Sequence, residues 1–231
     1  MLTPFWPTMT GVTRYVGNVQ SLVLQAEVYP CLLIGRRKFH IRSYVVVVEN
    51  LASDNLFDVY LYNRHEIRLA SNPVSEEDDG DRERSAHITN GGMADTTERL
   101  LLHEVEELAG RNLQAKVETF VAQIFGEHFV PDMARRISYS AQQDEGTSAV
   151  DGVDVRKFVM AGLDIMVTSD ERLYLLEVNV NPAAPPADNL SETFQNHLVE
   201  YMKDVLHLLV DGRNASPNFV SCQSILAQRK A

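Results

Sequence analysis

The apolar positions of residues 160–180 follow the two-residue period of β-strands on both sides of a short polar break. Residues 160–168 and 173–180 form two largely apolar runs, and Ser169–Arg172 separates them. This pattern predicts a β-hairpin with a two- or four-residue loop centred between Asp170 and Glu171. In that register the apolar side chains share one face, in the pairs Leu163–Val178, Ile165–Leu176 and Val167–Tyr174.

The other face of this predicted hairpin carries an unusual pair of carboxylates. Met166 meets Leu175 there, Asp164 meets Glu177, and Asn179 points to the same side as Glu177. Opposed side chains have Cβ atoms about 5 Å apart, so like charges in this arrangement are destabilising. A bound divalent cation with Asn179 as a third oxygen ligand would resolve the conflict, as would one protonated carboxyl or a solvated sheet end. An odd-length loop would shift the register by one residue and break this pairing.

A second strand, within Gly35–Glu49, alternates from Lys38 onward. Three potentially cationic side chains share one side and three uncharged ones the other: Lys38, His40 and Arg42 against Phe39, Ile41 and Ser43. The cationic side suits a polyanion such as a triphosphate or an acyl phosphate. The alternative is a solvated edge strand that carries charges against aggregation. Val45–Val48 is too apolar for an edge, which favours the phosphate interpretation.

The rest of the pattern predicts further strands and helices. Asp58–Ser71 is expected to form a hairpin that turns near Asn63–His65, with Arg68 in its return strand. A capping box, Asp95-x-x-Glu98, predicts a helix that ends at Gly110. Further helices are expected over 113–128 and over 191–210, the latter capped by Asn189 or Ser191. We expect residues 1–20 to be an irregular lead-in, 21–210 a single α+β domain, and 211–231 a tail.

Composition narrows the class of protein. The chain has 231 residues, 45% hydrophobic residues and a formal net charge of −11. This acidity argues against a nucleic-acid-binding surface as the main function. No apolar run reaches the length that spans a bilayer, and the N-terminus lacks the pattern of a signal peptide. Cys31 and Cys222 provide no disulfide framework, which fits a reduced, intracellular compartment.

The candidate site residues have complementary chemistry. Cations that could bind phosphate lie on two strands, Lys38 and Arg42 on one and Arg68 on the other. Carboxylates that could bind Mg²⁺ lie on the predicted hairpin, at Asp164 and Glu177. This combination indicates metal-bridged nucleotide chemistry. The sequence contains no Walker A loop, no kinase motif set and no Gly-x-Ser-x-Gly elbow, which excludes those three enzyme classes.

Five short motifs follow one another along the chain. They are Arg37–Arg42, then Val59–Tyr62 with Ile67–Arg68, then His87–Asn90, then Gly162–Asp164, then Leu176–Asn179 with Pro182. In this order and spacing they resemble the tubulin–tyrosine ligase family of ATP-grasp enzymes, from about Leu22 to Val210. The resemblance implies the α+β fold of an ATP-grasp C-terminal subdomain, a largely antiparallel sheet packed with helices.

The resemblance also implies an activity and a set of site residues. The expected protein is an ATP- and Mg²⁺-dependent ligase that attaches a free amino acid, of the tyrosine or the glutamate/glycine type, through an acyl phosphate. Its acceptor would be the acidic C-terminal tail of tubulin or another protein, with no role for nucleic acid or membrane and a cytoplasmic, microtubule-associated location. The implied residues are Asp164, Glu177 and Asn179 for Mg²⁺, Arg42, Arg68 and Glu177 for catalysis, and Gln25, Ala26, Glu27, Val28, Lys38, Thr89 and Asn90 for the nucleotide.

The chain also departs from the family pattern. His40 stands where the family usually has Asp, and Ala26 where a Lys is common. The residues before Gln25 contain neither the lysine nor the Gly-rich loop of the other ATP-binding half. We therefore expect the chain to be the C-terminal half of the catalytic unit. The alternative function is an incomplete or inactive family fragment that acts as a protein-binding module.

Overall fold

The computed structural model describes residues 27–50, 56–74, 86, 89, 98–132, 157–182, 190–211 and 216–230. Within these residues no helix is long and apolar enough to cross a membrane. The predicted division of the chain at residues 20 and 210 stays a prediction, and residues 1–20 lie outside the described ranges.

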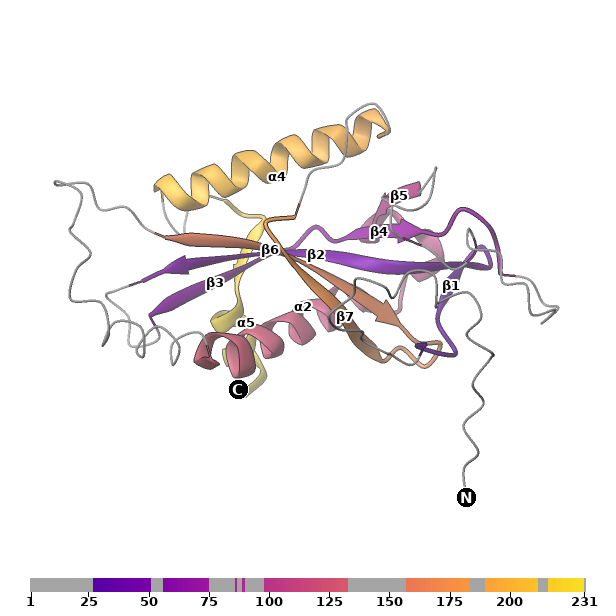
Figure 1. Cartoon of the computed structure of the whole chain (residues 1–231), viewed down its shortest axis with the longest axis horizontal. Coiled ribbons are helices and arrows are strands. Elements are labelled where there is room, and N and C mark those ends of the chain that lie inside the picture. Colours follow the sequence, from indigo (N-terminus) through magenta and orange to yellow (C-terminus); the bar gives the residue numbers. More distant parts are fainter. Residues whose placement is uncertain are drawn as a thin grey trace, which may run out of the picture.

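One long strand, β2 (Arg37–Glu49), organises the sheet (Figure 1). It pairs with β6 (Phe158–Val167) along one edge and with β3 (Phe57–Tyr62) and β4 (Glu66–Leu69) along the other. Three further strands pair with these on their outer sides: β7 (Leu173–Val180) with β6, β8 (Phe219–Ser221) with β3, and β5 (Glu98–Leu101) with β4. The short β1 (Leu33–Ile34) pairs with the start of β2. Each of these pairings is antiparallel, so the α+β prediction is confirmed.

Helices cover both faces of the sheet, because side chains of β2 alternate between two apolar clusters. On one face, β2 side chains pack with α2 (Leu113–Gln123) and its π-helical extension η5 (Ile124–Phe129); this cluster includes Phe39, Ile41, Val45, Val47, Val117, Val121 and Phe125. On the other face, they pack with α4 (Glu192–Asp211), in a cluster that includes Tyr44, Val46, Val48, Tyr201, Val205 and Leu208. Figure 1 shows α4 on one side of the sheet, with α2 and α5 (Cys222–Lys230) on the other.

The predicted hairpin over Asp58–Ser71 is wrong. β3 and β4 do not pair with each other, because both lie along the same edge of β2. Leu61 pairs with Val45, and Glu66 pairs with Arg42, so the segment between the two strands is two residues longer than the part of β2 opposite it. The chain bulges there and continues instead of turning back. A polar break in a strand pattern cannot by itself distinguish these two outcomes.

The helix predicted from the capping box is also wrong. Glu98–Leu101 forms β5, and short 3₁₀ turns follow at Leu102–Glu104 and Glu106–Leu108. The backbone of this segment bonds across to β4, and Leu102 N donates to His65 O at 2.9 Å. Strand pairing therefore overrides the local helical pattern. Asp95 lies outside the described residues.

The two other helices are confirmed. α2 with η5 covers 113–129, and α4 begins one residue after Ser191. Phe194 N donates to Ser191 Oγ at 3.3 Å, so Ser191 caps α4 as predicted, while Asn189 lies outside the described residues. Within the predicted tail, residues 219–230 form β8 and α5, although the sequence shows no period there. These elements are too short to show a period and depend on contacts with β3 and α2.

Candidate functional site

The hairpin that carries the two carboxylates is present, and its central pairing is confirmed. Asp164 faces Glu177 across β6 and β7, and Leu163 faces Val178. Nearer the tip the predicted pairs are wrong, since Ile165 faces Leu175, Met166 faces Tyr174 and Val167 faces Leu173. The register therefore changes by one residue between Asp164 and Ile165.

An odd loop and a β-bulge together explain this change. The loop has three residues, Ser169–Glu171, with a bond of 2.8 Å from Glu171 N to Thr168 O and a left-handed Glu171 at φ 64. Such a loop shifts the register by one residue, as anticipated for an odd length. Leu176 is the extra residue opposite the step from Asp164 to Ile165, and it shifts the register back. The bulge thus restores Glu177 to the position opposite Asp164.

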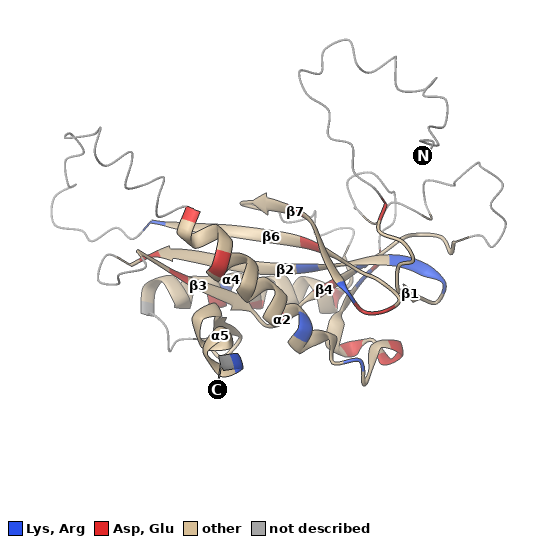
Figure 2. Cartoon of the chain, turned by 90° about the horizontal axis from the view of Figure 1, so that it is seen from below, with Lys and Arg blue, Asp and Glu red and all other residues tan. Residues whose placement is uncertain are grey.

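Four charged residues form a row across the sheet at this level. Glu66 on β4 pairs with Arg42 on β2, Arg42 pairs with Asp164 on β6, and Asp164 pairs with Glu177 on β7. The row lies on the face that α4 partly covers, since Arg42 is two residues from Tyr44 in the α4 cluster. In Figure 2 blue segments of β2 and β4 lie beside the red segment of β6. Strand pairing thus gathers charges that are far apart in sequence.

The centre of the row is a buried ion pair. Arg42 Nη2 donates to Asp164 Oδ2 at 2.9 Å, and Arg42 Nε donates to Oδ1. The side chains are 6% and 5% exposed, so this pair is shielded from solvent. Burial alone would raise the pKa of Asp164, but hydrogen bonds from His40 and Arg42 outweigh it and hold that pKa well below its usual range. Burial likewise opposes the charge of Arg42, and the bonds to Asp164 raise its pKa nevertheless.

The predicted cationic face of β2 is confirmed, and its side chains have acidic or polar partners. Lys38 forms an ion pair with Glu27 and is itself buried. His40 Nδ1 lies 2.6 Å from Thr89 Oγ1, and His40 Nε2 lies 3.3 Å from Asp164 Oδ1. The structure therefore brings Glu27, Thr89 and Asp164 to this strand. Gln25, Ala26 and Asn90 lie outside the described residues, and Val28 is half-buried beside Glu27.

The predicted Mg²⁺ ligands offer only oxygen donors. Glu177 is exposed, and Asn179 Nδ2 donates to Glu177 Oε1 at 2.9 Å, which leaves the amide oxygen of Asn179 available. Asp164 uses two of its roughly four lone-pair directions on Arg42. Two carboxylates and one amide fit the preference of Mg²⁺ for oxygen. Within the described residues no group of three or more His, Cys, Asp or Glu could hold a metal ion, so Asn179 is needed to complete a set.

Sequence reasoning missed three residues that adjoin this site. Glu66 is fully buried, and Arg68 Nη2 donates to its Oε2 at 3.3 Å. Arg99 on β5 pairs with Arg68 on β4, and its guanidinium carbon lies 5.7 Å from the ring centre of Phe194. Burial and the neighbouring charge of Arg68 lower the pKa of Arg99. His197 of α4 approaches Glu66 Oε1 at 3.8 Å.

Of these three residues, only Glu66 had a signal in the sequence. The alternation of β4 places Glu66 and Arg68 on one face, so Glu66 was visible once Arg68 had been chosen. Arg99 lay in a segment predicted as helix, and only the pairing of β5 with β4 brings it to Arg68. His197 shares a helical face with Phe194 and Tyr201, but nothing local indicates that α4 covers this sheet face.

Comparison with solved structures identifies the class of fold. The crystal structure of the C-terminal domain of Pby1 from K. lactis, described as an ATP-grasp enzyme that interacts with the mRNA decapping enzyme Dcp2, superposes with a TM-score of 0.51 at 19% sequence identity. The match covers 81% of this chain and 48% of that one. The antiparallel sheet with its helices is therefore an ATP-grasp type of fold.

The sequence identifies the family within this class. The model of the tubulin-tyrosine ligase family matches residues 16–216, and the chain belongs to that family. Among its relatives are a tubulin glycylase of Tetrahymena thermophila, 23% identical over 87% of this chain, and a probable tubulin–tyrosine ligase of Schizosaccharomyces pombe, 23% identical over 78%. A tubulin polyglutamylase of Caenorhabditis briggsae is 24% identical over 92% of the chain. The chain spans only 20%, 41% and 35% of the lengths of these three proteins, respectively.

Proposed function

We propose that this chain is the C-terminal part of an ATP- and Mg²⁺-dependent ligase that joins an amino acid to a protein acceptor. The observation that carries the proposal is the row Glu66–Arg42–Asp164–Glu177 on an ATP-grasp type of sheet. Family membership supports it, and the printed names of the three relatives favour tubulin as the acceptor.

The proposed reaction has two steps. A carboxylate takes the terminal phosphoryl group of ATP, which forms an acyl phosphate and ADP; an amine then attacks the acyl carbon, and phosphate leaves as the amide forms. Negative charge develops on phosphoryl and acyl oxygens in both steps, so fixed cations lower the barrier. We propose that Arg42 and Arg68 stabilise this negative charge. Lys38, with Thr89 nearby, would contact the nucleotide. Glu27 and Val28 would adjoin the adenine.

Asp164, Glu177 and Asn179 are the proposed holders of Mg²⁺. When bound, Mg²⁺ would neutralise phosphate oxygens. The ion pair between Arg42 and Asp164 keeps the Asp164 carboxylate charged and its orientation fixed. Glu177 is exposed, and the bond from Asn179 orients it.

Calorimetry of ATP binding with and without Mg²⁺ tests the proposal. We expect the chain to bind ATP only when Mg²⁺ is present, and Glu177→Gln to weaken that binding about tenfold or more. The matched control is Asp170→Asn, which neutralises an exposed carboxylate at the tip of the same hairpin and should leave binding within about twofold. The metal assignment would be rejected if ATP bound equally well with and without Mg²⁺. It would also be rejected if Glu177→Gln and the wild type bound ATP with equal affinity.

One observation favours a second function, that of a family module which binds a protein without catalysis. Lys38, Arg42 and Arg68 each have an acidic partner within the described chain, so the cations are partly neutralised before any nucleotide arrives. An absence of ATP binding, together with retained binding of a tubulin-tail peptide, would support this alternative.

A further inference from the structure

The contact between Arg42 and Asp164 occupies two groups that the proposed reaction assigns to different ligands. Arg42 Nε donates to Asp164 Oδ1, and Arg42 Nη2 donates to Oδ2 at 2.9 Å, so one guanidinium bonds to both carboxylate oxygens. Asp164 is a proposed ligand of Mg²⁺, whereas Arg42 is a proposed partner of phosphate. Each side chain therefore holds the other in the place of its ligand.

The surroundings of Asp164 disfavour a metal ion as long as this contact persists. The Asp164 side chain is buried, and His40 Nε2 lies 3.3 Å from its Oδ1. A divalent cation that approached these oxygens would meet the positive charge of Arg42 at close range, and like charges repel more strongly in a shielded site than in water. The carboxylate therefore binds a metal ion well only after the guanidinium has moved away.

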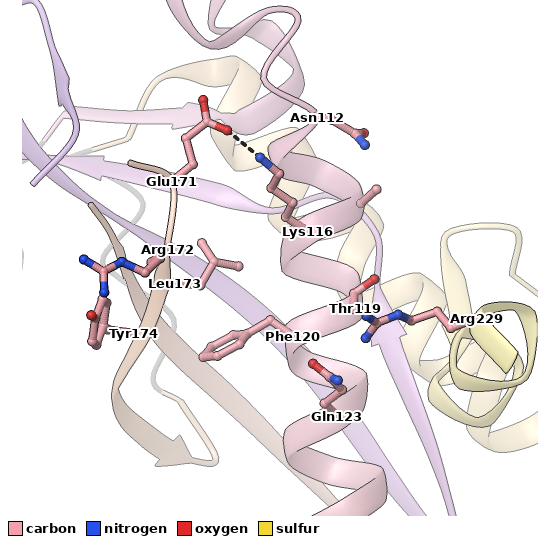
Figure 3. A pocket seen from close by; sticks show the side chains of 11 residues that line it. Asn112, Lys116, Thr119, Phe120, Gln123, Glu171, Arg172, Leu173, Tyr174 and Arg229 are labelled. Carbon is pink, nitrogen blue, oxygen red and sulfur yellow. Dashed lines mark hydrogen bonds and ion pairs between the residues drawn. The ribbon is translucent and has the colours of Figure 1, made fainter. Parts of the chain in front are cut away.

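The backbone that carries Asp164 is fixed, so separation of the pair is a side-chain movement. β6 lies between β2 and β7, and the tip of the β6–β7 hairpin is tied to α2. There Lys116 Nζ donates to Glu171 Oε2 (Figure 3), and Arg111 Nη1 donates to Glu171 Oε1 at 2.9 Å. Separation therefore requires a turn of the Arg42 side chain rather than a movement of the strand.

A phosphate group provides the acceptor that would draw Arg42 away. Lys38 shares the face of β2 that carries Arg42, and Arg68 lies on the same face in the neighbouring strand β4, opposite His40. Arg68 Nε is buried and has no hydrogen-bond acceptor among the described residues. A buried donor without an acceptor is costly, and a phosphate oxygen would satisfy it. An anion in this position would offer acceptors to Arg42 as well.

From these contacts we infer that Arg42 is a placeholder for the metal ion at Asp164. It neutralises this carboxylate until the phosphates of a nucleotide draw the guanidinium away, and Asp164 then becomes available to the metal ion. The inference rests on the proposed function for its two ligands, and it adds that their binding is coupled, since each ligand removes the group that blocks the other. Such a coupling acts equally in both directions. Replacement of either side chain should therefore expose the other to its own ligand.

Calorimetry with Mn²⁺ and the full chain, without nucleotide, tests the first half of this exchange. Mn²⁺ is the probe because carboxylate ligands suit it as they suit Mg²⁺. Arg42→Gln removes the charge and leaves at most one bond to Asp164, so it should bind Mn²⁺ about tenfold more tightly than the wild type. The double variant with Asp164→Asn should lose this gain. The matched control is Arg99→Gln, which removes a positive charge from the same sheet face and should change Mn²⁺ affinity by less than about twofold.

Calorimetry with ATP and a metal chelator tests the second half. Asp164→Asn weakens the hold on Arg42 and keeps the size of the side chain, so it should bind metal-free ATP about tenfold more tightly than the wild type. The matched control is Glu177→Gln, which removes a negative charge from the neighbouring strand but leaves Arg42 bonded to Asp164. It should change the affinity for metal-free ATP by less than about threefold.

The inference would be overturned if Arg42→Gln bound Mn²⁺ no more tightly than the wild type, or if Arg99→Gln produced an equal gain. Equal gains of Asp164→Asn and Glu177→Gln for metal-free ATP would also overturn it, because the effect would then be one of net charge. Circular dichroism checks the fold of each variant, and the comparison with ATP decides alone if Arg42→Gln does not fold. A wild type that fails to bind ATP with Mg²⁺, beside a gain of Mn²⁺ affinity in Arg42→Gln, would affect only the proposed ligase function.

Discussion

At the scale of single residues, opposite charges paired across strands define the candidate site. Asp164 pairs with Arg42, and Glu66 contacts Arg68, in surroundings where each side chain is at most 6% exposed. Arg68 in turn faces Arg99 across β4 and β5, so Glu66 is the buried carboxylate that offsets these two like charges. A buried charge without a partner is costly, and the stability of this region therefore depends on Glu66.

Replacement of Glu66 by Gln should lower the free energy of unfolding by about 3 kcal/mol, because it leaves Arg68 without its acidic partner in a buried site. Urea denaturation followed by circular dichroism measures the change. The control is Glu200→Gln, which removes the partner of Arg64 in an ion pair whose carboxylate is 53% exposed. That change should cost less than about 1 kcal/mol. If both variants lowered the free energy of unfolding by a similar amount, burial would not explain the contribution of Glu66 to stability.

At the scale of elements, the β6–β7 hairpin positions its functional residues through two local features. The bulge at Leu176 returns Glu177 to the position opposite Asp164 after the three-residue loop has shifted the register. Gly162 gives room to the Arg42 side chain, since a Cβ at this position would lie 3.0 Å from Arg42 Nη1 and 3.2 Å from Arg42 Cδ. The site thus depends on one extra residue in β7 and one absent side chain in β6.

Gly162→Ala should push the Arg42 guanidinium away from Asp164 and lower the free energy of unfolding by about 1–3 kcal/mol. The added methyl group would also lie 3.3 Å from Pro182 Cβ, which limits its freedom to move. A double-mutant cycle with Arg42→Met identifies the cause, because the cost of Gly162→Ala should shrink once the guanidinium is gone. Additive costs would place the strain elsewhere in the hairpin.

At the scale of the whole molecule, the two helical layers enclose histidines that stay neutral. His65 is fully buried against Ser43, with Oγ to Nδ1 at 3.0 Å. His197 is on the buried side of α4, where its ring contacts the rings of Tyr62 and Phe194. Burial lowers the pKa of His65 to about 3; burial, with a smaller effect of the nearby Arg64 charge, lowers that of His197 to about 4. The usual histidine pKa is 6.5, so the unfolded chain binds these protons first as the pH falls.

The folded state should therefore lose stability from about pH 6.5 downward, by about 1.4 kcal/mol per pH unit for each histidine. Above pH 6.5 this contribution is fully present. The lowered pKa of Asp164 adds a further loss only below about pH 4, since its carboxylate stays charged to lower pH in the folded chain than in the unfolded one. Unfolding free energies between pH 4 and pH 7 measure the slope.

His197→Phe should remove one histidine's share of that slope, because phenylalanine cannot take up a proton and keeps an aromatic ring in contact with Tyr62 and Phe194. Leu206→Phe is the matched control on the exposed side of α4; it introduces the same aromatic side chain without removing a titratable group, so it should leave the slope as in the wild type. An unchanged slope in His197→Phe would mean that other groups produce the acid sensitivity.

The sequence by itself determined the features that depend on local periodicity. The alternation of β2 placed Lys38, His40 and Arg42 on one face, and the helical spacing predicted α2 and α4. The order of the motifs also indicated the family that the comparison confirms. Such features repeat within a few residues, because side-chain direction follows from backbone geometry alone.

Only the tertiary structure decided which strands meet. The placement of β3 and β4 on the same edge of β2, the strand at Glu98–Leu101, and the contacts of Glu66 with Arg68 and His197 all arise from partners distant in sequence. The three-residue loop shifts the register by one residue, and the bulge at Leu176 shifts it back. The predicted pairing of Asp164 with Glu177 is therefore correct although the predicted loop length is wrong. Hydrogen bonds and buried area between strands outweigh local preference, and a sequence pattern shows which side chains share a face but not which strand lies opposite them.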